Sequence, residues 1–138
     1  MCWCRSRSSK HSSGLVGHPT DYIDLYVYGG IEQASQTSFT VNGTLPFGYG
    51  NPLYNNTACL HEAASAAAAS TNCAANTSRV WQVTGGFWWD VYKGDFGRLR
   101  VGGQGSFTER QVFAGIGGGP NTNEGIFMAA LRYYPFAP

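Results

Sequence analysis

The chain has 138 residues, the size of one domain, and carries a formal net charge of +1 at pH 7. A charge this close to zero gives no electrostatic basis for binding nucleic acid, so we exclude that class of partner. Charged residues make up 12% of the chain, about half the usual share, whereas aromatic residues reach 14% and glycines number 19. This composition is typical of β proteins. No apolar run approaches the roughly 18 residues of a membrane-spanning helix.

The opening stretch, MCWCRSRSSKHSSGLVGHPT, is polar, rich in serine and without hydrophobic periodicity. No apolar stretch follows its positive charges, so the pattern is not that of a signal peptide. We therefore predict a disordered or non-native segment at residues 1–20. Residues 21–138 are predicted to form a single antiparallel β domain that contains a long loop over residues 42–78.

The first periodic segment, DYIDLYVYGGIEQ at residues 21–33, alternates between two kinds of side chain. Leu25 and Val27 belong to its apolar face, whereas Asp24 and Tyr26 belong to the other face. Alternation with a period of two predicts a strand with one apolar and one polar, aromatic face.

The long loop carries the candidates for covalent and catalytic chemistry. Cys59 and Cys73 bracket thirteen residues there, a spacing that permits a disulfide in an oxidising compartment; the alternative is two unpaired thiols. Between them, His61 stands next to Glu62. In a small hydrolase of esters or lactones, His61 would act as general base and Glu62 would orient it.

The next two periodic segments, RVWQVTGGFWWDVY and RLRVGGQGSFTER, alternate in the same way. The connection KGDFG between them is short and contains glycine, which predicts a hairpin. If Asp90 pairs with Arg100, apolar positions face apolar positions and one cross-strand pair has opposite charges. The same register brings the ring of Trp88 beside Gly102.

The last segment, residues 124–136, is apolar and aromatic and is predicted to be a fourth strand. Pro135 cannot donate a hydrogen bond to a ladder and therefore belongs at the end of that strand. If the four strands alternate in direction, both long loops fall at one end, and the tight turn and Phe136 fall at the other. Such asymmetry is typical of bacterial outer-membrane β-barrels.

The stretch GGFWWDVYKGDFGRLRVGGQ, together with RYYPF, resembles the end of a porin-like family of bacterial outer-membrane proteins, and the resemblance covers residues 21–136. It implies an all-β fold, an antiparallel meander of about four strands like the C-terminal strands of a barrel, located in the bacterial outer membrane. It also implies that Tyr134 and Phe136 belong to the signal read by the barrel-insertion machinery and join an aromatic girdle. The implied role is structural or the transport of small solutes, without a cofactor.

Four strands are too few for a closed barrel, which needs about eight. Each edge of a four-stranded sheet leaves unpaired backbone groups, which lipid does not tolerate. We therefore expect this chain to be the C-terminal part of a longer barrel or to complete its sheet by self-association. A compact soluble sheet with its apolar faces packed together is the alternative.

The polar face of the predicted hairpin suits the wall of an aqueous lumen. In alternate positions it carries Arg98, Arg100, Gln104 and Arg110, with Asp90 opposite. An excess of arginine in a lumen would favour anions. The alternative interpretation is an ordinary solvent-exposed face of a sheet.

Two further functions stay open. In the hydrolase alternative, Asp90 or Asp95 could replace the loop carboxylate as the orienting group, or carboxylates could bind calcium. No HExxH zinc motif is present in the sequence. In the other alternative, a glycan-binding β-module, Trp88 and Tyr92 would stack on sugar rings.

Overall fold

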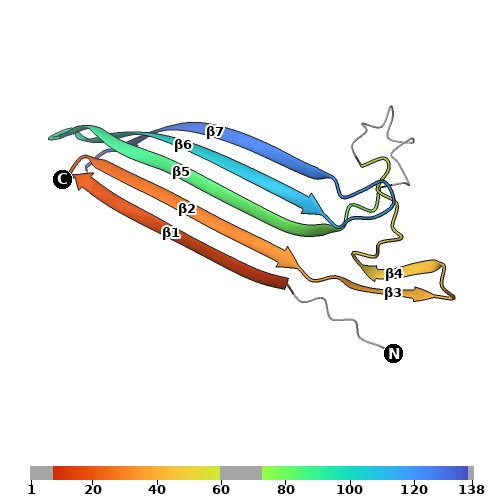
Figure 1. The fold of residues 1–138 in the computed structure, drawn as a ribbon. Coiled ribbons are helices and arrows are strands. Elements are labelled where there is room, and N and C mark those ends of the chain that lie inside the picture. Colours follow the sequence, from red (N-terminus) through yellow and green to blue (C-terminus); the bar gives the residue numbers. More distant parts are fainter. Residues whose placement is uncertain (1–7, 60–72, 137–138) are drawn as a thin grey trace. The chain divides into compact units, whose positions relative to one another are not determined.

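The computed structural model describes residues 8–59 and 73–136 (Figure 1). This part of the chain is all β with antiparallel sheets, as predicted. Its seven strands are β1 (Ser8–Thr20), β2 (Ile23–Ala34), β3 (Thr37–Val41), β4 (Leu45–Tyr49), β5 (Thr77–Gly94), β6 (Gly97–Val112) and β7 (Asn121–Tyr134). The large sheet has the strand order β1-β2-β5-β6-β7, whereas β3 and β4 pair separately. No helix in these residues is long and apolar enough to cross a membrane.

The chain divides into two compact units, and all five strands of the large sheet contribute residues to both. The unit that we call the loop unit consists of residues 1–10, 31–80 and 109–123. The unit that we call the sheet unit consists of residues 11–30, 81–108 and 124–138.

The predicted count of four strands is wrong, because β1, β3 and β4 were not expected. β1 covers Ser8–Thr20, inside the segment predicted to be disordered or non-native; residues 1–7 lie outside the described part of the chain. Its sequence has no alternation because β1 is an edge strand and every residue in it is exposed. Polar contacts with β2 accompany this pairing: Lys10 lies 2.9 Å from Glu32, and His18 lies 2.7 Å from Asp24.

The expected long loop over residues 42–78 contains most of a hairpin. β3 and β4 pair in antiparallel register with Val41 opposite Leu45, and the rings of Phe39 and Phe47 stack with their centroids 5.7 Å apart. The turn between the strands has φ values of 55° at Asn42 and 70° at Gly43. Asn-Gly is the pair that most readily adopts two positive φ angles, so this dipeptide was the missed signal.

The contacts expected for the KGDFG hairpin are present in the sheet unit. Only two residues separate β5 from β6. Arg100 Nε lies 2.7 Å from Asp90 Oδ1. A Cβ added to Gly102 would come within 2.5 Å of the ring of Trp88, so the ring lies directly over this glycine.

The two long connections contact each other within the loop unit. In the loop unit, the Asn56 amide donates to the carbonyl of Ile116 at 2.7 Å, and the Ile116 amide donates to the carbonyl of Tyr54 at 2.9 Å. In the sheet unit, the Tyr133 hydroxyl donates to the carbonyl of Phe96 in the tight turn. The two loops thus belong to one unit, and the tight turn and the end of β7 belong to the other.

No hydrophobic residue in the described part of the chain is buried. The sheet unit leaves large apolar side chains exposed at alternate positions of its strands, which share the face predicted to be apolar: Leu25, Val27, Val83, Phe87, Trp89 and Val91. The buried polar or charged residues are Asn51, Asn56 and Asp90. The described residues therefore bury polar groups and leave an apolar surface uncovered, the reverse of a globular core.

Candidate functional site

The strongest concentration of charge lies on the polar face of the sheet unit and joins β1, β2, β5 and β6. We call it the charge network, and it consists of His18, Asp24, Asp90, Arg98 and Arg100. The four residues from β2, β5 and β6 occupy alternate, even-numbered positions of their strands. Even-numbered positions of one strand share a face, and the ion pairs among these residues show that the three strands present them on the same face, opposite to the apolar positions.

Asp90 is the buried centre of the charge network, with a side chain only 1% exposed. It forms an ion pair with Arg98 and a second with Arg100, whose Nε lies 2.7 Å from Asp90 Oδ1. The Asp90 amide also donates to the carbonyl of Tyr22 at 2.8 Å, which ties β5 to the residue immediately before β2. A buried carboxylate needs such compensation, because an unpaired charge away from water is costly.

Asp24 extends the charge network toward the β1 edge of the sheet. Its carboxylate pairs with Arg100 through one oxygen and lies 2.7 Å from His18 Nδ1 through the other. Arg100, 16% exposed, therefore serves both acidic residues. Its planar guanidinium can do so because its donors point along several in-plane directions.

Two arginines lie against Trp88 on the same polar face. The guanidinium carbon of Arg132, on β7, lies 4.3 Å from the ring centroid of Trp88, and that of Arg100 lies 5.6 Å away. Because Gly102 supplies no side chain, the ring lies close to the backbone of β6. Trp88 is therefore occupied by cations, which leaves less of its ring for a sugar. Tyr92, the other candidate stacking residue, is 42% exposed.

Gln104 and Arg110, both predicted to face a lumen, lie in different surroundings. Gln104 belongs to the sheet unit, where its Oε1 accepts a hydrogen bond from the Tyr26 hydroxyl at 2.8 Å. Arg110 belongs to the loop unit, where it donates to Thr77 Oγ1 at 2.7 Å and to the carbonyl of Ala75 at 2.6 Å. The structure thus joins Asp90, Arg98 and Arg100 but gives Arg110 a separate role in holding a loop.

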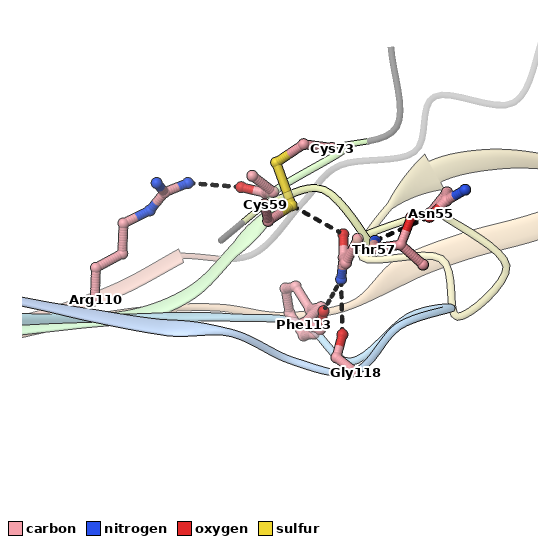
Figure 2. Close-up of a disulfide and its surroundings, with 9 residues drawn as sticks. Asn55, Thr57, Cys59, Cys73, Arg110, Phe113 and Gly118 are labelled. Carbon is pink, nitrogen blue, oxygen red and sulfur yellow. Dashed lines mark hydrogen bonds between the residues drawn. A yellow bond between two sulfur atoms is a disulfide. The ribbon is translucent and has the colours of Figure 1, made fainter. Parts of the chain in front are cut away.

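The loop unit contains a disulfide between Cys59 and Cys73 (Figure 2). Beside it, the side-chain amide of Asn56 donates to the carbonyls of Phe113 and Gly118, both at 3.0 Å. Asn55 Oδ1 accepts hydrogen bonds from its neighbour Thr57. These contacts fix main-chain geometry around the disulfide and bring no catalytic group together.

Only some of the hydrolase candidates fall within the described residues, so an arrangement with His61 stays a prediction. His61 and Glu62 lie outside the described residues. Asp90 is engaged by two arginines, and Asp95 is exposed in the tight turn after β5. Within residues 8–59 and 73–136, no three His, Cys, Asp or Glu side chains gather closely enough to hold a metal ion.

A shallow, open hollow of about 400 Å³ marks the apolar face of the sheet unit. It forms where Gly85, Gly105 and Gly125 interrupt three neighbouring strands, with Phe107 and Phe127 among its lining residues. A hollow lined in this way has too few polar groups to orient a substrate for catalysis.

The aromatic end of the chain lies with the tight turn in the sheet unit. Tyr134 is the last residue of β7 and is 39% exposed, and Phe136 is 95% exposed with a φ of 69°. Neither side chain is packed into a core. Their proposed part in an insertion signal depends on accessibility of this kind.

Three residues on the polar face of the sheet unit were not among the predicted site residues: His18, Asp24 and Arg132. Asp24 stands out in the sequence as a charge at a strand position that alternates with apolar residues, so it was open to prediction. His18 and Arg132 were not, because their roles depend on which strands become neighbours.

Compared with known proteins, the chain matches no family model, no curated protein and no solved structure.

Proposed function

We propose that this chain forms part of the wall of a bacterial outer-membrane β-barrel, with its apolar face toward lipid and its polar face toward an aqueous lumen for small solutes. The observation that carries the proposal is the absence of any buried hydrophobic residue in the described chain, combined with exposed apolar side chains on one face. Such a surface needs an apolar environment to cover it, and lipid provides one without a second layer of protein.

Strand length supports the proposal. A tilted strand needs about 9–11 residues to cross the hydrocarbon core of a membrane. The large sheet meets this requirement throughout, since its shortest strand, β2, has 12 residues and its longest, β5, has 18. Strands of this length are long for a water-soluble domain, where about 5–6 residues are most common.

The distribution of charge supports it as well. Asp24, Asp90 and Arg100 belong to the face opposite the exposed apolar side chains and satisfy one another there. Charged groups in membrane proteins face water-filled interiors or one another. A lumen wall accounts for a charged face and an apolar face on the same strands.

The two edges of the sheet call for further strands. Among the described strands, β1 and β7 have a neighbour on only one side, and every residue in both is exposed. Unpaired backbone groups are not tolerated in lipid. We therefore propose self-association, or pairing with additional strands, as part of the function, with the end of β7 available to the insertion machinery.

The first test is the mass of the purified chain by light scattering, in plain buffer and in detergent. We expect a stable assembly of two or more copies only in detergent, because detergent covers the apolar face while edges pair. A single copy that stays soluble and folded in plain buffer would contradict the membrane proposal.

A matched pair of variants tests which face meets lipid. Val83 and Thr84 are neighbours in β5 and project from opposite faces. Lysine on a lipid-facing position costs about 2–4 kcal/mol near the membrane centre, so Val83→Lys should strongly reduce insertion into liposomes. Thr84→Lys should reduce it far less. Equal effects of the two substitutions would contradict the proposed orientation.

A further inference from the structure

We propose that Arg132, held against Trp88, is the principal binding group for small oxyanions, such as phosphate or carboxylates, on the polar face. This inference deepens the proposed function, on which it rests for the idea that the bound ion is a transported solute. An arginine that binds such an ion must have an uncompensated charge and free N–H donors.

Arg98 and Arg100 are compensated by carboxylates. Arg98 pairs with Asp90, and Arg100 pairs with both Asp90 and Asp24. Their side chains are also only 30% and 16% exposed. Because opposite charges surround them, these two arginines attract a further anion weakly.

Arg132 differs from both. Among the described residues its one contact of this kind is with the ring of Trp88, 4.3 Å from the guanidinium carbon. A cation–π contact orients a guanidinium but does not neutralise it. Since Arg132 is exposed on β7, its N–H groups face solvent with no carboxylate partner in the described chain.

The local balance of charge favours an anion. In the charge network taken together with Arg132, three guanidinium groups, those of Arg98, Arg100 and Arg132, accompany two carboxylates, those of Asp24 and Asp90. One positive charge is left over, and it belongs to the arginine without a partner. A planar guanidinium presents a fork of donors that matches two oxygens of a phosphate or carboxylate.

The test is a titration of the full chain in detergent micelles with sodium phosphate, followed by the NMR signals of the tryptophan indole N–H groups. Ionic strength is kept constant with sodium chloride. The four tryptophans give four indole signals, and Trp88→Phe identifies that of Trp88. We expect a saturable shift of the Trp88 signal, because an ion on Arg132 changes the field at the ring.

The variants separate this site from general attraction. Arg132→Gln should weaken phosphate binding about tenfold or more, the equivalent of one lost charge-assisted interaction. Arg132→Lys keeps the positive charge but lacks the planar fork of donors. Its affinity for phosphate should therefore lie between those of the wild-type chain and Arg132→Gln. Lys93→Gln removes the same charge from an exposed residue of the same unit and should leave binding unchanged.

A shift that does not saturate, that persists in Arg132→Gln, or that is lost equally in Lys93→Gln would overturn the inference. The outcome is independent of the test of membrane assembly. A detergent-dependent assembly without a phosphate-dependent shift would contradict the anion site alone. A soluble single copy that still binds phosphate through Arg132 would contradict the transport role and leave the site standing.

Discussion

Among the described residues of the loop unit, the buried polar side chains are the amides of Asn51 and Asn56, which donate to main-chain carbonyls. In the sheet unit, the buried polar side chain is the carboxylate of Asp90, which pairs with guanidinium groups. Neutral amides suit irregular backbone, whose carbonyls lack regular partners. Ion pairs suit paired strands, where the backbone is already satisfied and side chains link one strand to the next.

Because of this difference, the two units should respond to different perturbations. The loop unit depends on its disulfide and on side-chain bonds to the backbone, so it should be sensitive to reduction and to loss of single amides. The sheet unit depends on compensation of charge across strands, so it should be sensitive to removal of one member of the charge network. Hydrogen exchange can assign each loss of stability to its unit.

The largest effect is expected for Asp90→Asn. The substitution leaves Arg98 and Arg100 with only Asp24 to compensate them. Removing one partner of a buried ion pair costs about 3–5 kcal/mol, and we expect a loss of about 4 kcal/mol in denaturant unfolding in detergent. Amide exchange should accelerate in the sheet unit and not in the loop unit. Asp95→Asn is the matched control, with little expected effect; an equal loss there would contradict the assignment.

Removal of the disulfide comes next. Cys59 and Cys73 are separated by 14 positions, and a crosslink that closes a loop of that length stabilises by about 3 kcal/mol. The double substitution Cys59→Ser and Cys73→Ser should lose this amount and accelerate exchange in the loop unit. Wild-type chain treated with a reductant should behave in the same way. An unfolding midpoint that does not change on reduction would contradict the prediction.

Asn56→Ala should have an intermediate effect within the loop unit. The substitution removes both donors to the carbonyls of Phe113 and Gly118 (Figure 2). A buried polar group left without its partner costs about 1–3 kcal/mol, so we expect about 2 kcal/mol by thermal or denaturant unfolding. Asn55→Ala, which removes a local contact with Thr57, should cost clearly less. If the two alanine variants lose the same stability, the role given to Asn56 is wrong.

The smallest effect is expected for Tyr133→Phe in the sheet unit. It deletes one exposed hydrogen bond, from the Tyr133 hydroxyl to the carbonyl of Phe96, and leaves the ring in place. A single hydrogen bond contributes about 0.5–1.5 kcal/mol net, and exposure favours the lower end. Exchange should change only near the tight turn. A loss as large as that of Asp90→Asn would mean that the turn, and not the charge network, stabilises this unit.

Three long alternating segments and one apolar, aromatic segment made four strands of the large sheet predictable, with ends within a few residues of the observed ones. The hairpin of β5 and β6 also allowed the contacts of Asp90 with Arg100 and of Trp88 with Gly102 to be expected. The local sequence pattern determines both of these contacts, because the faces of the strands and a tight turn suffice to align the residues.

The remaining strands and contacts depend on which segments pair with each other, and the local sequence pattern does not determine that pairing. β1 is mostly polar apart from Leu15 and Val16 and becomes a strand by hydrogen bonding to β2, so its own sequence gives no alternation. The links from Asp24 to Arg100 and from Arg132 to Trp88 join strands far apart in the sequence. Such contacts follow from strand order, which alternation alone does not determine.

The strand directions restrict how this sheet can close. β1 and β7 both run from the loop unit into the sheet unit, so the two edges of this five-stranded sheet are parallel to each other. Joined directly, they would form a parallel seam, within one ring or between copies arranged head to tail. A ring that is antiparallel throughout requires an odd number of strands between β7 and β1, which gives the even total found in single-chain bacterial barrels. The direction of the two edge strands therefore determines that an odd number of further strands is needed to complete an antiparallel ring.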